Sequence, residues 1–260
     1  MPIGICNLSV IPLRGADAHR SEMVSQVLFG EQFEILRHEK EWSHIRMLDT
    51  GYEGWLQQGQ FLVLEENNVY HEPISDCLVV DKSGAVACWG EKKVLLVPGT
   101  KLTKQLMDGR IAAFPYRIKG DFRKPVQQDF ETEFPELLDY YRNTPYLWGG
   151  RTSMGIDCSG LTQAMMVYFG IQLPRDAYQQ AEQGKTVDFL TEIRPGDLAF
   201  FDNEEGRITH VGIMIDTETI FHASAYIRID KMDSEGIFNI EHNRYTHKLR
   251  IVKRFLNNDF

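Results

Sequence analysis

The sequence predicts an α+β domain that follows one or two small all-β barrels. Short β-type runs, broken by turn residues, fill residues 3–64. A second group of such runs fills residues 77–116. From residue 134 onward, helical periodicity comes first and strand-type segments follow. Helices followed by a sheet are typical of an α+β domain, so the barrels and this domain are expected to be separate segments.

The first barrel is expected within residues 1–66. Its β-type runs are separated by turn signals at Gly30 and Gly51 and by the polar residues 38–41. The predicted strands are residues 26–29, 32–36, 42–47 and 54–56.

The second segment is expected to span residues 67–125, after a polar linker at residues 65–72. It is interpreted as a second, degenerate barrel; the alternative is an elaborated linker packed on the domain that follows. Residues 122–129 are expected to be the last connector. The predicted strands are residues 77–80, 85–89, 94–97 and 112–116.

The third segment, residues 126–260, is predicted to open with a helix starting near Pro135. Proline suits the first turn of a helix because that turn does not need its N–H. The dipeptide Thr144-Pro145 is expected to end this helix.

A second helix is predicted to start at Cys158, because apolar residues recur at helical spacing after it, and to stop near Gly170. A shorter helix is expected to carry Tyr178. Strands are expected from Leu198 onward, forming an antiparallel sheet.

Cys158 is a candidate nucleophile. It lies at a glycine-flanked junction between a loop and a helix, where unpaired N–H groups and the helix dipole lower the pKa of a thiol. The alternative is a buried free cysteine that acts as a small apolar side chain.

Two histidines are candidates for the base that such a nucleophile needs. His210 and His222 lie on strand-like segments joined by a turn at residues 216–218. In this interpretation His210 is the base and His222 orients it. The alternative is that both are ordinary half-buried strand residues. Zinc binding is not predicted, because no third ligand accompanies them at a recognisable spacing.

The sequence resembles the NlpC-type cysteine peptidases, a papain-like family that acts on bacterial cell-wall peptides. The resemblance covers residues 134–256 and implies Cys158, His210 and His222 as the catalytic triad. The motifs that carry it, in chain order, are Asp157-Cys158-Ser159-Gly160, Leu173-Pro174-Arg175, Arg194-Pro195-Gly196-Asp197-Leu198-Ala199-Phe200-Phe201, His210-Val211-Gly212 and His222-Ala223.

Residues 30–56 resemble bacterial SH3-type domains. The expected fold is therefore an α+β papain-like catalytic domain preceded by one or two small all-β SH3-type barrels. The segments that carry this second resemblance are Gly30-Glu31-Gln32-Phe33-Glu34-Ile35-Leu36, Trp42 and Gly51-Tyr52-Glu53-Gly54-Trp55-Leu56.

Two donors are expected for the oxyanion that forms during attack: the backbone N–H of Cys158 and the hydroxyl of Tyr146. Packing is the alternative role for Tyr146. Asp157 places a carboxylate next to the nucleophile, where it would hinder a thiolate without a cationic partner. A substrate ammonium group is expected to be that partner.

The resemblance also implies a substrate-binding site for a free N-terminal L-alanine. It assigns Asp157 and Ser159 from the peptidase to this site, and by analogy Tyr52 and Glu22 from the first barrel. Tyr52 as a barrel aromatic and Glu22 as a solvated charge are the alternatives. Some relatives have serine where this sequence has Ala177, so one ligand of the pocket is missing from the pattern.

The resemblance therefore implies a dipeptidyl-peptidase that releases L-Ala-γ-D-Glu from the following diamino acid, meso-diaminopimelate or L-lysine, in murein peptide recycling. The alternatives are an exported hydrolase of intact peptidoglycan, a catalytically silent wall-peptide binding protein, and an amidase or acyltransferase on another amide.

Composition limits the partners. With 28 Lys+Arg and 37 Asp+Glu the formal charge is −9, which argues against nucleic acid. The sequence shows no signal peptide and no membrane-spanning run, so a cytoplasmic monomer is expected, or an exported protein if a signal precedes Met1. The four cysteines are expected to be free thiols. No metal or cofactor is expected.

Overall fold

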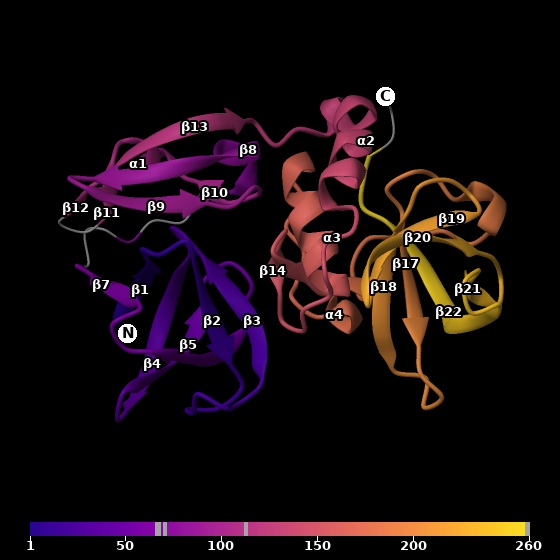
Figure 1. Ribbon diagram of the computed structural model, residues 1–260, viewed down its shortest axis with the longest axis horizontal. Coiled ribbons are helices and arrows are strands. Elements are labelled where there is room, and N and C mark those ends of the chain that lie inside the picture. The colour runs from indigo at the N-terminus through magenta and orange to yellow at the C-terminus, as the bar shows by residue number, and fades with distance from the viewer. Residues whose placement is uncertain (66–68, 70–71, 112–113, 258–260) are drawn as a thin grey trace. The chain divides into compact units, whose positions relative to one another are not determined.

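The computed structural model describes residues 1–260 apart from 66–68, 70–71, 112–113 and 258–260. Its contacts divide the chain into two compact units, Met1–Pro125 and Val126–Phe260 (Figure 1). All four cysteines are free thiols, as predicted. None of the described helices has both the length and the apolar composition needed to cross a bilayer.

The first unit begins with a seven-stranded antiparallel sheet in the order β3-β2-β6-β5-β4-β1-β7. All four predicted strands are present. Alternate side chains of β2 and β5 are buried, as expected for strands with one face on a core. The strands are β1 Ile3–Cys6, β2 Val10–Arg14, β3 Met23–Leu28, β4 Gln32–Glu39, β5 Trp42–Met47, β6 Glu53–Gln57 and β7 Phe61–Leu64.

A second sheet in this unit is built around one long strand, β8 (Leu78–Trp89), where two strands were predicted. Gly84, inside β8, has φ of +80° and lets the strand bend rather than turn back. β8 pairs with β9 (Lys92–Leu96), β10 (Lys101–Leu102) and β13 (Arg117–Arg123). β13 replaces the first residues of the connector predicted at 122–129.

The remaining elements of this segment are short. They are η2 Ile74–Asp76, α1 Lys104–Met107, β11 Arg110–Ile111 and β12 Phe114–Pro115. Part of the strand predicted at 112–116, and most of the polar stretch at 65–72, lie outside the described residues.

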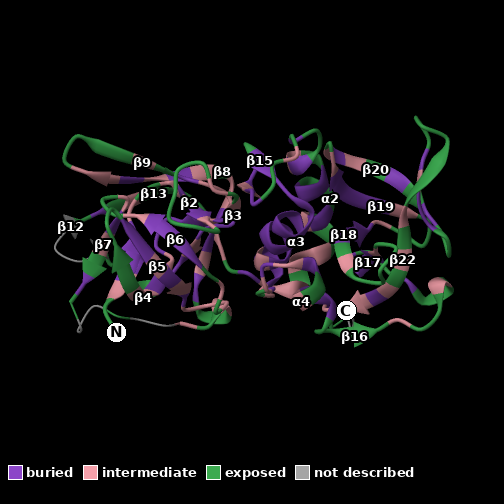
Figure 2. Cartoon of the chain, turned by 90° about the horizontal axis from the view of Figure 1, so that it is seen from below, coloured by how far each residue is buried: buried purple, intermediate pink, exposed green. Residues whose placement is uncertain are grey.

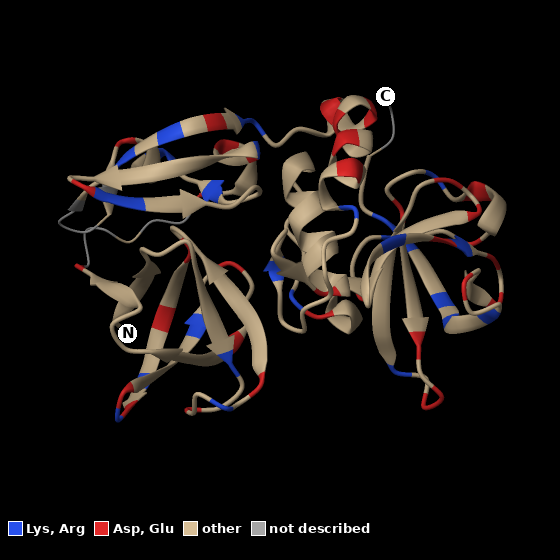
Figure 3. Cartoon of the chain, in the orientation of Figure 1, with Lys and Arg blue, Asp and Glu red and all other residues tan. Residues whose placement is uncertain are grey.

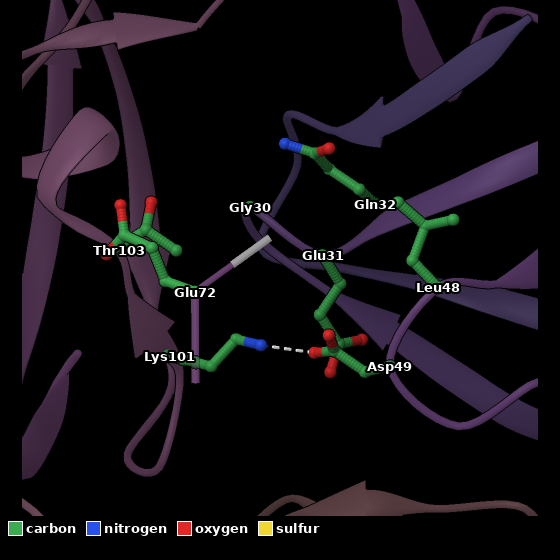
Figure 4. Close-up of a pocket in the computed structure, with 8 residues that line it drawn as sticks. All are labelled: Gly30, Glu31, Gln32, Leu48, Asp49, Glu72, Lys101 and Thr103. Carbon is green, nitrogen blue, oxygen red and sulfur yellow. Dashed lines mark hydrogen bonds and ion pairs between the residues drawn. The ribbon is translucent and has the colours of Figure 1, made fainter. Parts of the chain in front are cut away.

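The two sheets of the first unit share one core. Ile5 from β1 and Phe29, the residue after β3, pack in the same cluster as Val80 and Ala87 from β8. At the edge of this contact lies a small pocket in which Lys101 pairs with Asp49 (Figure 4). The second group of strands is therefore packed on the first sheet.

The second unit opens with η3 Gln127–Asp129 and α2 Phe130–Tyr141. The prediction that this helix starts near Pro135 is wrong: it starts at Phe130. Phe130 stacks on Phe134 with ring centroids 4.7 Å apart and also contacts Phe169, and these contacts stabilise the earlier turn. The opposite side of α2 carries acidic residues (Figure 3).

The next helix, α3 (Cys158–Met166), starts at the predicted residue. All its residues are buried (Figure 2). It continues as η4 (Val167–Phe169) and ends at Gly170, which has the left-handed φ of 73° and caps the helix as predicted. α4 (Ala177–Ala181) follows, with a capping box formed by Asp176 and Gln179.

The strands after α4 form an antiparallel sheet in the order β16-β22-β17-β18-β19-β20-β21, as predicted from Leu198 onward. Because β21 also pairs with β22, the strands β22, β17, β18, β19, β20 and β21 close into a barrel. The elements are β16 Lys185–Thr186, η5 Leu190–Glu192, β17 Leu198–Asp202, β18 Ile208–Met214, β19 Thr219–Ser224, β20 Tyr226–Met232, β21 Gly236–Asn239 and β22 Arg244–Arg254.

Candidate active site

Cys158 is the first residue of α3, and the loop before it is held close by glycines. The small hairpin β14 (Arg151–Thr152) and β15 (Gly155–Ile156) leads into the helix. A Cβ on Gly160 would lie 2.1 Å from the carbonyl oxygen of Gly150. The motif glycine at 160 is therefore required for the loop to contact the first turn of the helix.

Burial controls the protonation of Cys158. The residue is only 7% exposed, and burial raises the pKa of its thiol to about 12. The charge of Asp157 adds to the increase, whereas the N–H groups of Val211 and Ser159 and the charge of Arg175 lower the pKa. Burial therefore acts against the lowering that the helix start was expected to give, and the effect of burial is the larger one.

Asp157 has a cationic partner within the protein. Arg175 donates to both carboxylate oxygens, from Nη1 at 3.1 Å and from Nη2 at 2.5 Å, and both side chains are buried. The backbone N–H groups of Gly149 and Gly160 donate to the same carboxylate at 2.8 and 2.7 Å. The carboxylate of Asp157 therefore has a cationic neighbour before any substrate binds, and a contact of Asp157 with a substrate ammonium stays a prediction.

Arg175 also donates to the hydroxyl of Ser159 at 2.8 Å. One guanidinium thus holds the residues on both sides of Cys158. Arg175 was recognised only as part of a motif, and its role follows from this contact. The signal in the sequence was the charge of Arg175 within an apolar motif, because a buried guanidinium needs an acidic partner.

The two candidate histidines lie on paired strands, as predicted. His210 is on β18 and His222 is on β19, and Nε2 of His210 lies 2.9 Å from Nδ1 of His222. Gly212 is paired with His222, and a Cβ on Gly212 would lie 2.9 Å from that of His222. The glycine of the His210-Val211-Gly212 motif therefore gives His222 the space to reach His210.

Cys158 meets the strand that carries His210. Helix α3 packs on β18, and the N–H of Val211, the residue after His210, faces the sulfur. Burial lowers the pKa of His210 well below its ordinary value, and the neighbouring His247 and His222 add to the decrease. Burial therefore favours the neutral form of the candidate base.

Asp230 extends the chain of hydrogen bonds and was not predicted. Its Oδ2 lies 3.1 Å from Nε2 of His222, and Arg228 donates to its other oxygen at 3.0 Å. Burial raises the pKa of Asp230, but the hydrogen bonds from His222 and Arg228 outweigh it and hold the pKa below its ordinary value. The alternation Arg228-x-Asp230 on the strand paired with His222 was the available signal.

The ionised carboxylate of Asp230 determines which nitrogen of each ring carries a proton. It accepts from Nε2–H of His222, which leaves Nδ1 of His222 as an acceptor. That nitrogen accepts from Nε2–H of His210. Nδ1 of His210 is consequently the unprotonated nitrogen that can take a proton from Cys158.

Tyr146 lies close enough to Cys158 for Cys158 to affect the pKa of its hydroxyl. Burial raises the pKa of its hydroxyl, and the neighbouring Cys158 and Asp157 raise it further. The hydroxyl therefore keeps its proton at neutral pH and can donate it. Its backbone is held by a hydrogen bond from the N–H of Tyr146 to the carbonyl of Ala225.

The structure brings six of the predicted site residues into the second unit, and places Tyr52 and Glu22 in the first. Tyr52 precedes β6 and packs partly against the barrel core. Glu22 precedes β3 and is exposed. The six are Cys158, His210, His222, Tyr146, Asp157 and Ser159. Within the described ranges, no group of three or more His, Cys, Asp or Glu side chains is arranged to hold a metal ion.

Two family models match the chain. One describes the NlpC/P60 family and matches residues 143–249. The other describes the bacterial dipeptidyl-peptidase SH3 domain and matches residues 13–61. The first match contains every candidate catalytic residue, and the second contains Glu22 and Tyr52.

Two similar proteins carry the name gamma-D-glutamyl-L-lysine dipeptidyl-peptidase. The one from Bacillus subtilis is 30% identical over 217 residues, which are 76% of this chain and 71% of that protein. The one from Bacillus cereus is 25% identical over 237 residues, which are 78% of this chain and 68% of that protein.

The fold is also similar to a solved structure. The crystal structure of an NlpC/P60 family protein from Bacillus cereus superposes with a TM-score of 0.73, covering 98% of this chain and 99% of that one at 17% identity.

Proposed function

The chain belongs to the NlpC/P60 family of cysteine peptidases, and on that premise we propose that it releases L-Ala-γ-D-Glu from the diamino acid of free murein peptides. The predicted fold class, a papain-like domain preceded by SH3-type β-structure, is confirmed. The family acts on peptides of peptidoglycan. The free N-terminal L-alanine and the recycling role are parts of the proposal.

The observation that carries the chemistry is the continuous chain from His210 through His222 to Asp230, which starts on the strand that the Cys158 helix packs against. As the sulfur attacks the amide carbonyl, a carbon–sulfur bond forms and the thiol proton moves to Nδ1 of His210. His210 then gives this proton to the departing amine as the carbon–nitrogen bond breaks. Water, deprotonated by His210, cleaves the thioester and restores the thiol.

Burial raises the pKa of Cys158 and lowers the pKa of His210, so both shifts disfavour the charged forms in the empty site. We propose that the carbonyl of a bound substrate favours the proton transfer. The developing oxyanion would accept from the N–H of Cys158 and from the hydroxyl of Tyr146.

The substrate class is inferred from the names of the similar proteins, which act on a γ-D-glutamyl bond to L-lysine. Recognition of the free amine is proposed to involve Asp157, Ser159, Tyr52 and Glu22. Because Arg175 holds Asp157 and Ser159 in place, we propose that these two residues form the floor of the pocket that binds the substrate amine. For Glu22 and Tyr52 the proposal rests on the resemblance to the family alone.

The test is hydrolysis of L-Ala-γ-D-Glu-meso-diaminopimelate, its L-lysine analogue and their N-acetylated forms, followed by mass spectrometry. The enzyme should cleave the free-amine peptides and leave the acetylated ones intact. Cys158→Ala should reduce the rate by about 10⁴-fold or more, because it removes the nucleophile.

Each other outcome would contradict a defined part of the proposal. Equal cleavage of the acetylated peptides would agree with a peptidase activity but would reject the requirement for a free amine. Cleavage of intact sacculi would favour a hydrolase of the wall itself. No cleavage of any peptide would reject the proposed substrate class.

Glu22→Gln and Tyr52→Phe test the proposed contributions of the first barrel. Each should raise KM for the free-amine peptide by about 10-fold with little change in kcat, because each removes a polar contact to the bound substrate. Glu39→Gln, another exposed acidic residue of the barrel, is the matched control. Unchanged KM in both variants would remove these residues from the site.

A further inference from the structure

A third histidine lies against the candidate base. His247 on β22 stacks on His210 with ring centroids 4.1 Å apart and planes inclined by 25°. It also meets His222 edge-on at 5.9 Å. His247 belongs to none of the sequence motifs above, and its side chain is half-buried.

We propose that His247 is a positioning residue of this peptidase, whose ring covers the face of His210 and holds that base in the plane from which it serves Cys158. The inference rests on the proposed function because it assigns His210 as the base. It adds a fourth strand, β22, to the elements that build the site.

The geometry shows why a second contact is needed. The hydrogen bond from Nε2 of His210 to His222 fixes one edge of the ring but permits rotation about the line that joins the two nitrogens. The ring of His247 lies nearly parallel to the ring of His210, so it blocks that rotation. Phe201 contacts both rings, at 5.8 Å from His210 and 6.1 Å from His247.

The stack forms between neutral rings near pH 7. Burial and the neighbouring His222 lower the pKa of His247, and Asp230 opposes this decrease. The net result is a pKa of about 4. The groups that act on the pKa of His210 are His247 on β22 and His222 on β19, with Asp230 and Arg228 on β20 behind His222. Of the elements packed on β18, α3 carries Cys158 and β17 carries Asp202. α4 also packs on β18, and its titratable residue is Tyr178.

Removing the ring should change the protonation of His210 in a defined direction. The lowered pKa of His210 comes first from burial and then from His247. Without the ring, water reaches His210 and its pKa rises toward the ordinary value. Since the base works only when unprotonated, the acid limb of kcat/KM should move to higher pH.

The experiment compares His247→Ala with His247→Phe. The alanine variant should lose about 10-fold in kcat with KM unchanged, because the base is less well placed. Its acid limb should move up by about one pH unit. The phenylalanine variant keeps a ring over His210 and should retain kcat within about threefold and most of the wild-type acid limb.

An NMR titration of His210 in the Cys158→Ala background measures its pKa without any turnover. This readout separates the positioning role from the proposed substrate, because it stands even if no peptide is cleaved. The pKa of His210 should rise in Cys158→Ala/His247→Ala and stay low in Cys158→Ala/His247→Phe. An unmoved pKa and acid limb in the alanine variants, or equal damage in both substitutions, would overturn the inference. Near-ultraviolet circular dichroism checks that each variant is folded.

Discussion

Arg175→Met should lower the free energy of unfolding of the second unit by about 3–5 kcal/mol, because it leaves the buried carboxylate of Asp157 without its cationic partner. Methionine is similar in length, so the loss reports the charge rather than a cavity. Activity should fall as well, since Arg175 holds the residues on both sides of Cys158. Urea unfolding followed by circular dichroism measures the first effect, and peptide hydrolysis below the transition measures the second.

A double variant distinguishes an uncompensated charge from simple loss of packing. Asp157→Asn/Arg175→Met removes both charges and should recover more than half of the lost stability, while activity stays low because the pocket floor has changed. Arg254→Met is the matched control, because Arg254 pairs with the buried Asp197 at 2.8 and 2.7 Å elsewhere in the unit. The control should lose stability but keep kcat in the folded enzyme. A stable Arg175→Met single variant would contradict the role of this pair.

His222→Ala should reduce kcat by about 10³–10⁴-fold, because His210 loses the acceptor that sets its tautomer and its orientation. Asp230→Asn should reduce kcat by about 10–100-fold, because the amide no longer dictates which nitrogen of His222 carries the proton. Steady-state kinetics on the free-amine peptide measures both effects. KM should change little, since neither residue is assigned to substrate binding.

His242→Ala is the control for this prediction, because His242 is exposed on the same unit. It should leave kcat unchanged. If His222→Ala retained more than about a tenth of wild-type kcat, the orienting role would be wrong and another group would have to fix His210.

The sequence was informative about the catalytic domain because its residues act in short, local patterns. Glycine-flanked Cys158, the helix that follows it, and the turn between the strands of His210 and His222 were all recognisable locally. The start of α2 was misplaced because the signal considered, Pro135, was weaker than the packing of Phe130. Residues 77–80 and 85–89 were predicted as two strands, although they belong to one strand that bends at Gly84, where φ is positive.

The sequence by itself determined the fold class and the family, and it supplied the candidate nucleophile and the two candidate histidines. Only the tertiary structure decided how these groups are charged and held: Arg175 pairs with Asp157, Asp230 continues the chain from His222, and His247 covers His210. The physical reason is that burial, ion pairing and ring stacking arise between segments far apart in the sequence. The spacing of residues along the sequence does not predict these contacts, although they set the pKa values on which the chemistry depends.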